Sequence, residues 1–142
     1  MIEITLTKKL KGKELVKEME KEYGSIDRLQ RKLERGEGNM KLQLDFEDWE
    51  YFIKCPDEEI ERTTTKFTES LNMGMAEIEL INFIKNNHPK SMSELAKLTN
   101  KDVSNVQRRV KKLEKEGLIT LEEGNKNSKK PIVNYDKIEI AV

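Results

Sequence analysis

Side chains suited to nucleic-acid contacts gather between residues 104 and 115. The first half of this segment offers a hydroxyl, two amides and a guanidinium, from Ser104, Asn105, Gln107 and Arg108. Amides can pair bidentately with adenine, and a guanidinium can pair with guanine. The second half offers point charges suited to phosphates, from Lys111, Lys112 and Lys115. This order is typical of a helix that enters a DNA major groove N-terminus first.

An apolar stripe predicts the helix that positions these side chains. Val103, Val106, Val110 and Leu113 follow one another at helical spacing, so we expect them to be buried on one face. Asp102 is suited to cap the start of this helix, and Gly117 is suited to end it. The polar side chains listed above then occupy the opposite, exposed face.

Two shorter helices precede this one, and a hairpin follows it. Residues 76–87 predict the first helix, and a capping box at Ser91–Glu94 predicts a second that buries Leu95, Ala96 and Leu98. Residues 99–101 form the turn. Residues 118–121 and 131–135 predict two strands joined by a polar loop, with a last strand over 138–142. Three helices followed by a hairpin are the pattern of a winged helix-turn-helix.

The predicted DNA contacts extend beyond the third helix. Ser93 lies at the start of the second helix, and Lys101 lies in the turn. The hairpin loop adds Lys126, Lys129 and Lys130, which suit phosphate or minor-groove contacts. Each feature has a plainer interpretation: the polar helix face could be only solvated, and the loop could be only a mobile, solubilising tip.

The first seventy residues predict a mixed α/β region. Residues 1–6 alternate like a strand, residues 13–23 have helical periodicity, and Ser25 is suited to cap a further helix. Residues 40–46 alternate and could form a strand, followed by a helix that Pro56 ends. Residues 57–68 favour either an extended strand or a linker. We therefore expect an α+β protein with an N-terminal region, residues 1–71, and a winged-helix domain, residues 72–142.

An aromatic cluster in the N-terminal region allows two interpretations. Phe46, Trp49 and Phe52 lie within seven residues of one another. Core packing is the interpretation that we favour. A surface that binds a partner protein is the alternative, because aromatic side chains anchor many interfaces.

The net charge of zero conceals an uneven distribution. Residues 36–70 carry four basic and ten acidic side chains, whereas residues 71–135 carry twelve basic and eight acidic ones. Local fields rather than totals attract a phosphate backbone, so a neutral chain remains compatible with a DNA partner.

Several function classes find no support in the sequence. Cys55 is the one cysteine and His88 the one histidine, and neither has neighbours at metal-ligand spacing. No phosphate loop, nucleophile motif or cofactor fingerprint is present, so we expect no enzyme activity, no metal and no cofactor. The sequence contains no membrane-spanning run and no signal peptide, and one cysteine suits a reducing compartment, so we expect a cytoplasmic protein.

Several of these segments resemble a family of winged-helix transcriptional regulators that is widespread in archaea, also found in bacteria, and related to the MarR/ArsR class. The resemblance covers about residues 72–142. It is carried by Glu79–Ile84, His88–Ser91, Ser93–Ala96, Lys101–Val106, Lys112–Glu114, Gly117–Ile119 and Lys130–Ile140. The chain departs from the family pattern at Gln107, which is often histidine, and at Arg109, which is often acidic. These departures leave open which operator is read.

The resemblance implies a sequence-specific regulator of transcription that binds double-stranded DNA, as a repressor or an autoregulator. We expect a homodimer, because one helix covers too few base pairs for strong selectivity. Members of the family often resemble the antitoxin of a toxin–antitoxin pair, which would make residues 1–71 a toxin-binding or dimer-forming region. A winged helix that binds protein rather than DNA is the remaining alternative.

Overall fold

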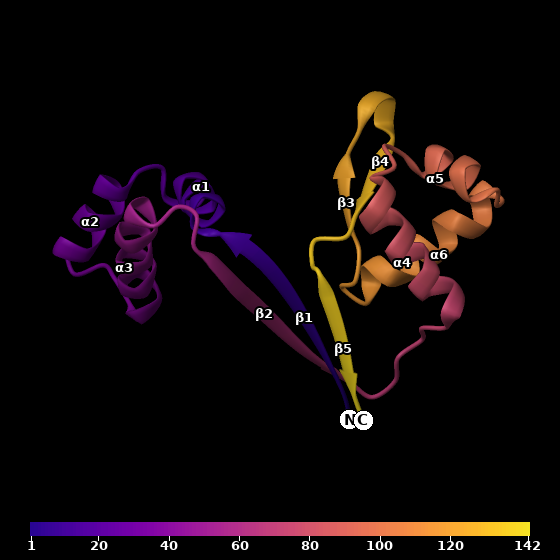
Figure 1. Ribbon diagram of the computed structural model, residues 1–142, viewed down its shortest axis with the longest axis horizontal. Helices are drawn as coiled ribbons and strands as arrows, with labels where there is room; N and C mark the ends of the chain where they lie inside the picture. Colours follow the sequence, from indigo (N-terminus) through magenta and orange to yellow (C-terminus); the bar gives the residue numbers. More distant parts are fainter. The chain divides into compact units, whose positions relative to one another are not determined.

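The computed structural model describes residues 1–142 and has the predicted α+β class (Figure 1). Its elements, in chain order, are β1 (Ile2–Lys11), α1 (Gly12–Tyr23), α2 (Ile26–Glu34), α3 (Met40–Lys54), β2 (Glu59–Thr68), α4 (Met75–Asn87), α5 (Met92–Thr99), α6 (Val103–Lys115), β3 (Thr120–Glu123), a 3-10 turn (Asn125–Asn127), β4 (Lys129–Ile132) and β5 (Lys137–Ala141). No helix is long and apolar enough to span a membrane.

The chain folds into two compact units. Unit 1 comprises residues 1–4, 66–135 and 139–142, and unit 2 comprises residues 5–65 and 136–138. The strands form two sheets, one in the order β2-β1-β5 and one consisting of the hairpin β3-β4.

Unit 1 contains helices α4, α5 and α6 followed by the β3-β4 hairpin, an arrangement consistent with a winged helix (Figure 1). The hairpin is antiparallel, with Thr120 opposite Ile132 and Glu123 opposite Lys129. Apolar side chains from all three helices and the following segment are buried: Leu80, Ile81, Ile84, Met92, Leu95, Ala96, Val106, Val110, Leu113, Leu118 and Ile119.

Local signals fix the start of α5 and the end of α6 as the sequence predicts, whereas Asp102 occupies the N-cap position of α6 without making a side-chain capping hydrogen bond. The Ser91 hydroxyl accepts a hydrogen bond from the Glu94 N–H at 3.0 Å, which caps α5. The Glu94 carboxylate reaches Lys90 N–H, one residue before the cap. Gly117 has a φ of +78°, the left-handed conformation that ends a helix, and the Leu118 N–H bonds the Leu113 carbonyl there.

Two apolar side chains predicted to be buried are exposed instead. Leu98 is 53% exposed and Val103 is 37% exposed. Both lie at helix ends, in the last turn of α5 and at the first position of α6, where little of the core reaches them. The buried stripe of α6 therefore consists of Val106, Val110 and Leu113 alone.

Unit 2 packs helices α1, α2 and α3 around a core of its own. This core contains Leu10, Leu15, Met19, Leu29, Trp49 and Phe52. Helices α1 and α3 approach closely at Gly12, where an added Cβ would lie 2.6 Å from Phe52 Cδ1 and 2.7 Å from the Cys55 carbonyl oxygen. A larger side chain there would push the two segments apart.

The predicted strand over residues 40–46 is wrong, because these residues form the first half of α3. Asn39 accepts a hydrogen bond from the Leu42 N–H at 3.0 Å and so caps a continuous helix. Met40 is 73% exposed and Leu44 is 51% exposed, whereas Leu42 and Phe46 pack against the core. The alternation arose because apolar side chains occupy both sides of this amphipathic helix.

The strands that flank unit 2 also extend further than predicted. Strand β1 runs to Lys11, and its buried residues are Ile4, Thr7 and Leu10 rather than Ile2, Ile4 and Leu6. Residues 59–68 form β2, so the strand interpretation of that segment holds and the linker interpretation does not.

Replacing Asn39 tests the cap of α3. Asn39→Ala should lower the free energy of unfolding by about 1 kcal/mol, because the Leu42 N–H loses its acceptor. Asn39→Ser should stay close to the wild type, because serine caps equally well. Urea unfolding followed by circular dichroism measures both. Equal stability of the alanine and serine variants would show that α3 does not begin at this cap.

Replacing Tyr135 tests a buried hydrogen bond in unit 1. The Tyr135 hydroxyl donates to the Leu118 carbonyl at 2.8 Å, and burial raises the pKa of Tyr135 from 10.0 to about 12. Tyr135→Phe should cost about 1 kcal/mol at neutral pH, because the carbonyl loses its donor.

The pH dependence of this variant follows from the same pKa. The folded protein keeps the phenol proton that the unfolded chain loses near pH 10, so this stabilisation is complete below pH 10 and declines between about pH 10 and 12. Phenylalanine has no such proton, so the gap between wild type and variant should narrow above pH 10. A gap that stays constant from pH 7 to pH 11 in urea unfolding would contradict this.

Candidate nucleic-acid interface

Helix α6 divides into a buried face and an exposed polar face. Val106, Val110 and Leu113 are each at most 1% exposed. Because a helix advances 100° per residue, burial of this stripe directs the side chains of the remaining positions away from the core. Ser104, Asn105, Gln107, Arg108 and Lys111 are exposed, and Lys112 is half-buried.

A cleft of about 440 Å³ lies between α6, the start of α5 and the β3-β4 hairpin. It brings together four of the predicted contact residues from three elements. Gln107 and Lys111 come from α6, Ser93 comes from α5, and Lys129 comes from β4. The cleft is also lined by Ser91, Met92, Glu114, Leu121, Asn127 and Ser128. Its chemistry is that of amides, hydroxyls and ammonium groups, with one carboxylate.

Asn105 and Lys101 lie on the other side of α6. They line a groove of about 290 Å³ with Ala76, Leu80, Asp102, Val106 and Arg109. The Asn105 side-chain oxygen Oδ1 accepts a hydrogen bond of 2.6 Å from Arg108 Nη2. The two side chains predicted to read separate bases are therefore linked to each other.

The remaining predicted contacts are spread around this region. Arg108, Lys111 and Lys112 line a third hollow together with Glu77, Arg109, Glu114 and Lys115. Ser104 lies on the exposed face of α6 without lining any of these three hollows.

The lysines of the hairpin differ in how fully their charges are balanced. Lys129 Nζ lies 3.2 Å from Glu123 Oε1, and Lys130 stands opposite Glu122 in the hairpin register. Lys126 lies at the tip, exposed, in a left-handed conformation with a φ of +53°. The exposed charge of the hairpin is therefore concentrated near Lys126.

Two contacts that the sequence did not indicate connect α6 to other elements. Arg109 Nη1 lies 4.0 Å from Glu77 Oε1 of α4, and Glu77 also accepts the Gly74 N–H at 2.9 Å. This backbone hydrogen bond, with a contribution from Arg109, holds the pKa of Glu77 below its ordinary value. At the other end, Lys66 of β2 donates to the Glu116 carbonyl at 2.7 Å, which neutralises the negative end of the helix.

Some of the missed residues carried a signal. Glu114 lies seven residues after Gln107, so a helical projection places both on one face. Arg109 borders the apolar stripe next to Val110. The contacts of Lys66 and Glu77 with α6 join residues far apart in the sequence, and no local pattern predicts them.

The aromatic cluster of unit 2 belongs to the core. Trp49 is 2% exposed and Phe52 is 7% exposed, and Phe46 packs against the same core half-buried. The Trp49 ring lies 6.3 Å from that of Tyr23. The packing interpretation fits these positions, and buried rings are not available to a partner without rearrangement.

Comparison with known proteins finds a family match for the second half of the chain. Residues 73–140 match the model of the HVO_A0114 family. No curated protein matches the chain. The matched segment begins just before α4 and ends within β5, so it includes the three helices, the hairpin and every predicted DNA contact. Residues 73–140 of this chain thus form an HVO_A0114 family domain.

Proposed function

We propose that unit 1 binds double-stranded DNA and that the chain is a sequence-specific transcriptional regulator. The observation that carries this proposal is the cleft between α5, α6 and the hairpin. It combines Gln107 and Lys111 of α6 with Ser93 of α5 and Lys129 of β4. Amide, hydroxyl and ammonium groups from three elements are what base edges and phosphates require.

In this proposal α6 enters the major groove and the hairpin reaches the adjacent backbone. Gln107 pairs with a base, and Arg108 reads guanine while Asn105 holds its guanidinium. Lys111, Lys112 and Lys126 contact phosphates. The hydrogen bond between Asn105 and Arg108 supports this division of roles, because the carbonyl that would accept from adenine already accepts from the arginine.

The chain acts as a homodimer on paired half-sites in this proposal, since a single α6 covers too few base pairs for selectivity. Occupying a promoter in this way would make it a repressor or an autoregulator.

A protein-binding winged helix is the competing proposal. Glu114 lines the cleft and Glu123 pairs with Lys129, so this surface is less cationic than its lysines alone suggest. An antitoxin would combine both activities, with DNA bound by unit 1 and a toxin by unit 2. The competing proposal would be favoured if the chain forms a stable complex with another protein but does not bind duplex DNA.

Arg108 and its partner should act as one unit on DNA. With a duplex selected by the wild type, Arg108→Ala should weaken binding by about 1–3 kcal/mol and relax selectivity at one base pair. Asn105→Ala should relax selectivity at the same base pair, and the double variant should lose little more than Arg108→Ala. Fluorescence anisotropy on duplexes with single base changes measures this. Additive losses at two separate base pairs would instead make Asn105 an independent reader.

Lys111 should contribute to affinity without contributing to selectivity. Lys111→Ala should weaken all duplexes alike and lower the slope of log affinity against log salt by about one unit. Lys129→Ala should change the slope less, because Glu123 already balances Lys129. Lys32→Ala in α2 is the matched control and should leave the slope unchanged. Titrations at four salt concentrations measure the slopes, and equal slopes for Lys111→Ala and Lys32→Ala would contradict the assignment.

A further inference from the structure

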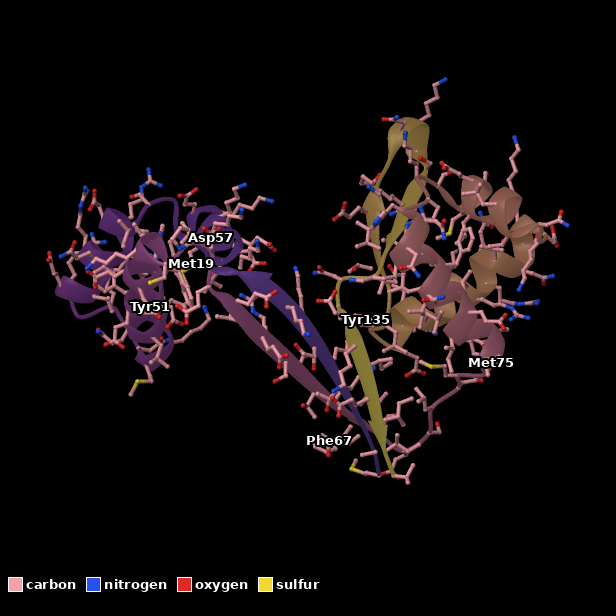
Figure 2. All side chains as sticks on the ribbon, viewed as in Figure 1. Met19, Tyr51, Asp57, Phe67, Met75 and Tyr135 are labelled. Atoms are coloured by element: carbon pink, nitrogen blue, oxygen red, sulfur yellow. The ribbon has the colours of Figure 1, made fainter.

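All the exposed large apolar side chains of unit 2 lie on one helix. Met40 is 73% exposed, Leu44 51%, Tyr51 48% and Ile53 52%, and all four belong to α3. The other large apolar side chains of the unit are buried or half-buried. Figure 2 labels Tyr51 on this helix.

Three of these side chains lie along one stripe of the helix surface, with Glu47 between the second and the third. Met40, Leu44 and Tyr51 are separated by four and seven residues, which are close to whole helical turns, so they lie along one line. The stripe extends about 16 Å along the helix axis. It lies on the side opposite Trp49, which is buried in the core. Ile53 projects in another direction, because it is two residues beyond Tyr51.

The stripe has acidic surroundings. Glu47 lies on its line, seven residues after Met40, and Asp48 and Glu50 lie on its two flanks. The Tyr51 hydroxyl donates to a further carboxylate, Glu58 Oε2, at 2.5 Å. Burial raises the pKa of Asp48, and the nearby charges of Asp45 and Glu47 raise it further. Carboxylates already crowd this helix.

The cations of α3 do little to neutralise this face. Lys41 Nζ lies 3.0 Å from Glu22 Oε1, 3.1 Å from the Tyr23 hydroxyl and 3.1 Å from Asp45 Oδ2. Its ammonium group therefore donates hydrogen bonds on the side of the helix that meets α1. Lys54, in the last turn, is the other cation of the helix.

We propose that this face of α3 docks a basic amphipathic helix of another protein. Apolar side chains of the partner would cover Met40, Leu44 and Tyr51, and its lysines or arginines would face Glu47, Asp48 and Glu50. A straight stripe three turns long matches the side of a second helix. A second copy of this chain fits poorly, because it would bring like carboxylates together. A nucleic acid also fits poorly, because these carboxylates repel its phosphate groups.

Selection from a display library of helical peptides on the immobilised full chain tests this proposal. The library varies the exposed positions of a helical scaffold and includes acidic, neutral and basic members equally. Enriched peptides should carry apolar residues at helical spacing flanked by lysine or arginine. Enrichment of acidic or uncharged peptides, or no enrichment above an empty support, would overturn the proposal.

Matched variants locate the binding surface. For the best enriched peptide, Leu44→Ser should weaken binding about tenfold, through loss of a central apolar contact. Ile53→Ser removes a side chain of equal exposure from the same helix but off the stripe, and should change affinity less than about twofold. Glu47→Gln should weaken binding and reduce its salt dependence, whereas Glu34→Gln in α2 should not.

Three further readouts keep the outcome unambiguous. Circular dichroism confirms that each variant is folded. Leu44→Ser should bind DNA as the wild type does, so failure of this proposal is distinguishable from failure of the DNA-binding proposal. Equal affinity of the Leu44→Ser and Ile53→Ser variants for the peptide would contradict the assignment of this docking face. Sedimentation showing that Leu44→Ser dissociates a dimer of the free chain would also overturn it, by making a second copy the occupant.

Discussion

Burial of a single stripe on α6 determines what unit 1 can present to a partner. Val106, Val110 and Leu113 have almost no exposed surface, so the rotation of the helix about its axis is fixed. A rotation that exposed them would cost several kcal/mol of apolar burial. Every exposed position follows from that rotation, including the placement of Gln107 and Lys111 in the cleft beside the hairpin. Arg109 also lies near Glu77 of α4, and Lys66 of β2 donates to the Glu116 carbonyl just after the helix.

The electrostatics of the cleft favour selectivity over general attraction. The hairpin pairs Lys129 with Glu123, and Glu114 places a carboxylate in the cleft itself. These acidic groups reduce the attraction of any phosphate backbone, whatever its sequence. The same acidic groups do not weaken the capacity of the Gln107 and Arg108 side chains to form hydrogen bonds with bases. A net charge of zero is therefore compatible with the proposed base contacts of Gln107 and Arg108, because those contacts do not depend on the overall field.

How well the sequence predicts each part depends on how local its determinants are. The helices of unit 1 follow from local signals: the Ser91 cap, the stripe of α6 and the left-handed Gly117 are all visible within a few residues. Residues 40–46 are misleading because a two-sided amphipathic helix can imitate strand alternation over a short window. The link between Asn105 and Arg108 lies within one helix turn, yet it depends on a rotamer that spacing alone does not specify. Contacts such as Lys66 with Glu116 require the fold itself.

Selection of duplexes from a random double-stranded DNA library by the full chain tests whether the exposed face of α6 reads base pairs. We expect enrichment of a defined motif consisting of two half-sites in inverted orientation. This enrichment should be lost when Gln107 and Arg108 are both replaced by alanine. The contrary result is an enriched pool indistinguishable from the starting library, or a motif that the Gln107→Ala/Arg108→Ala variant selects equally well. Either outcome would show that the exposed face of α6 does not read DNA.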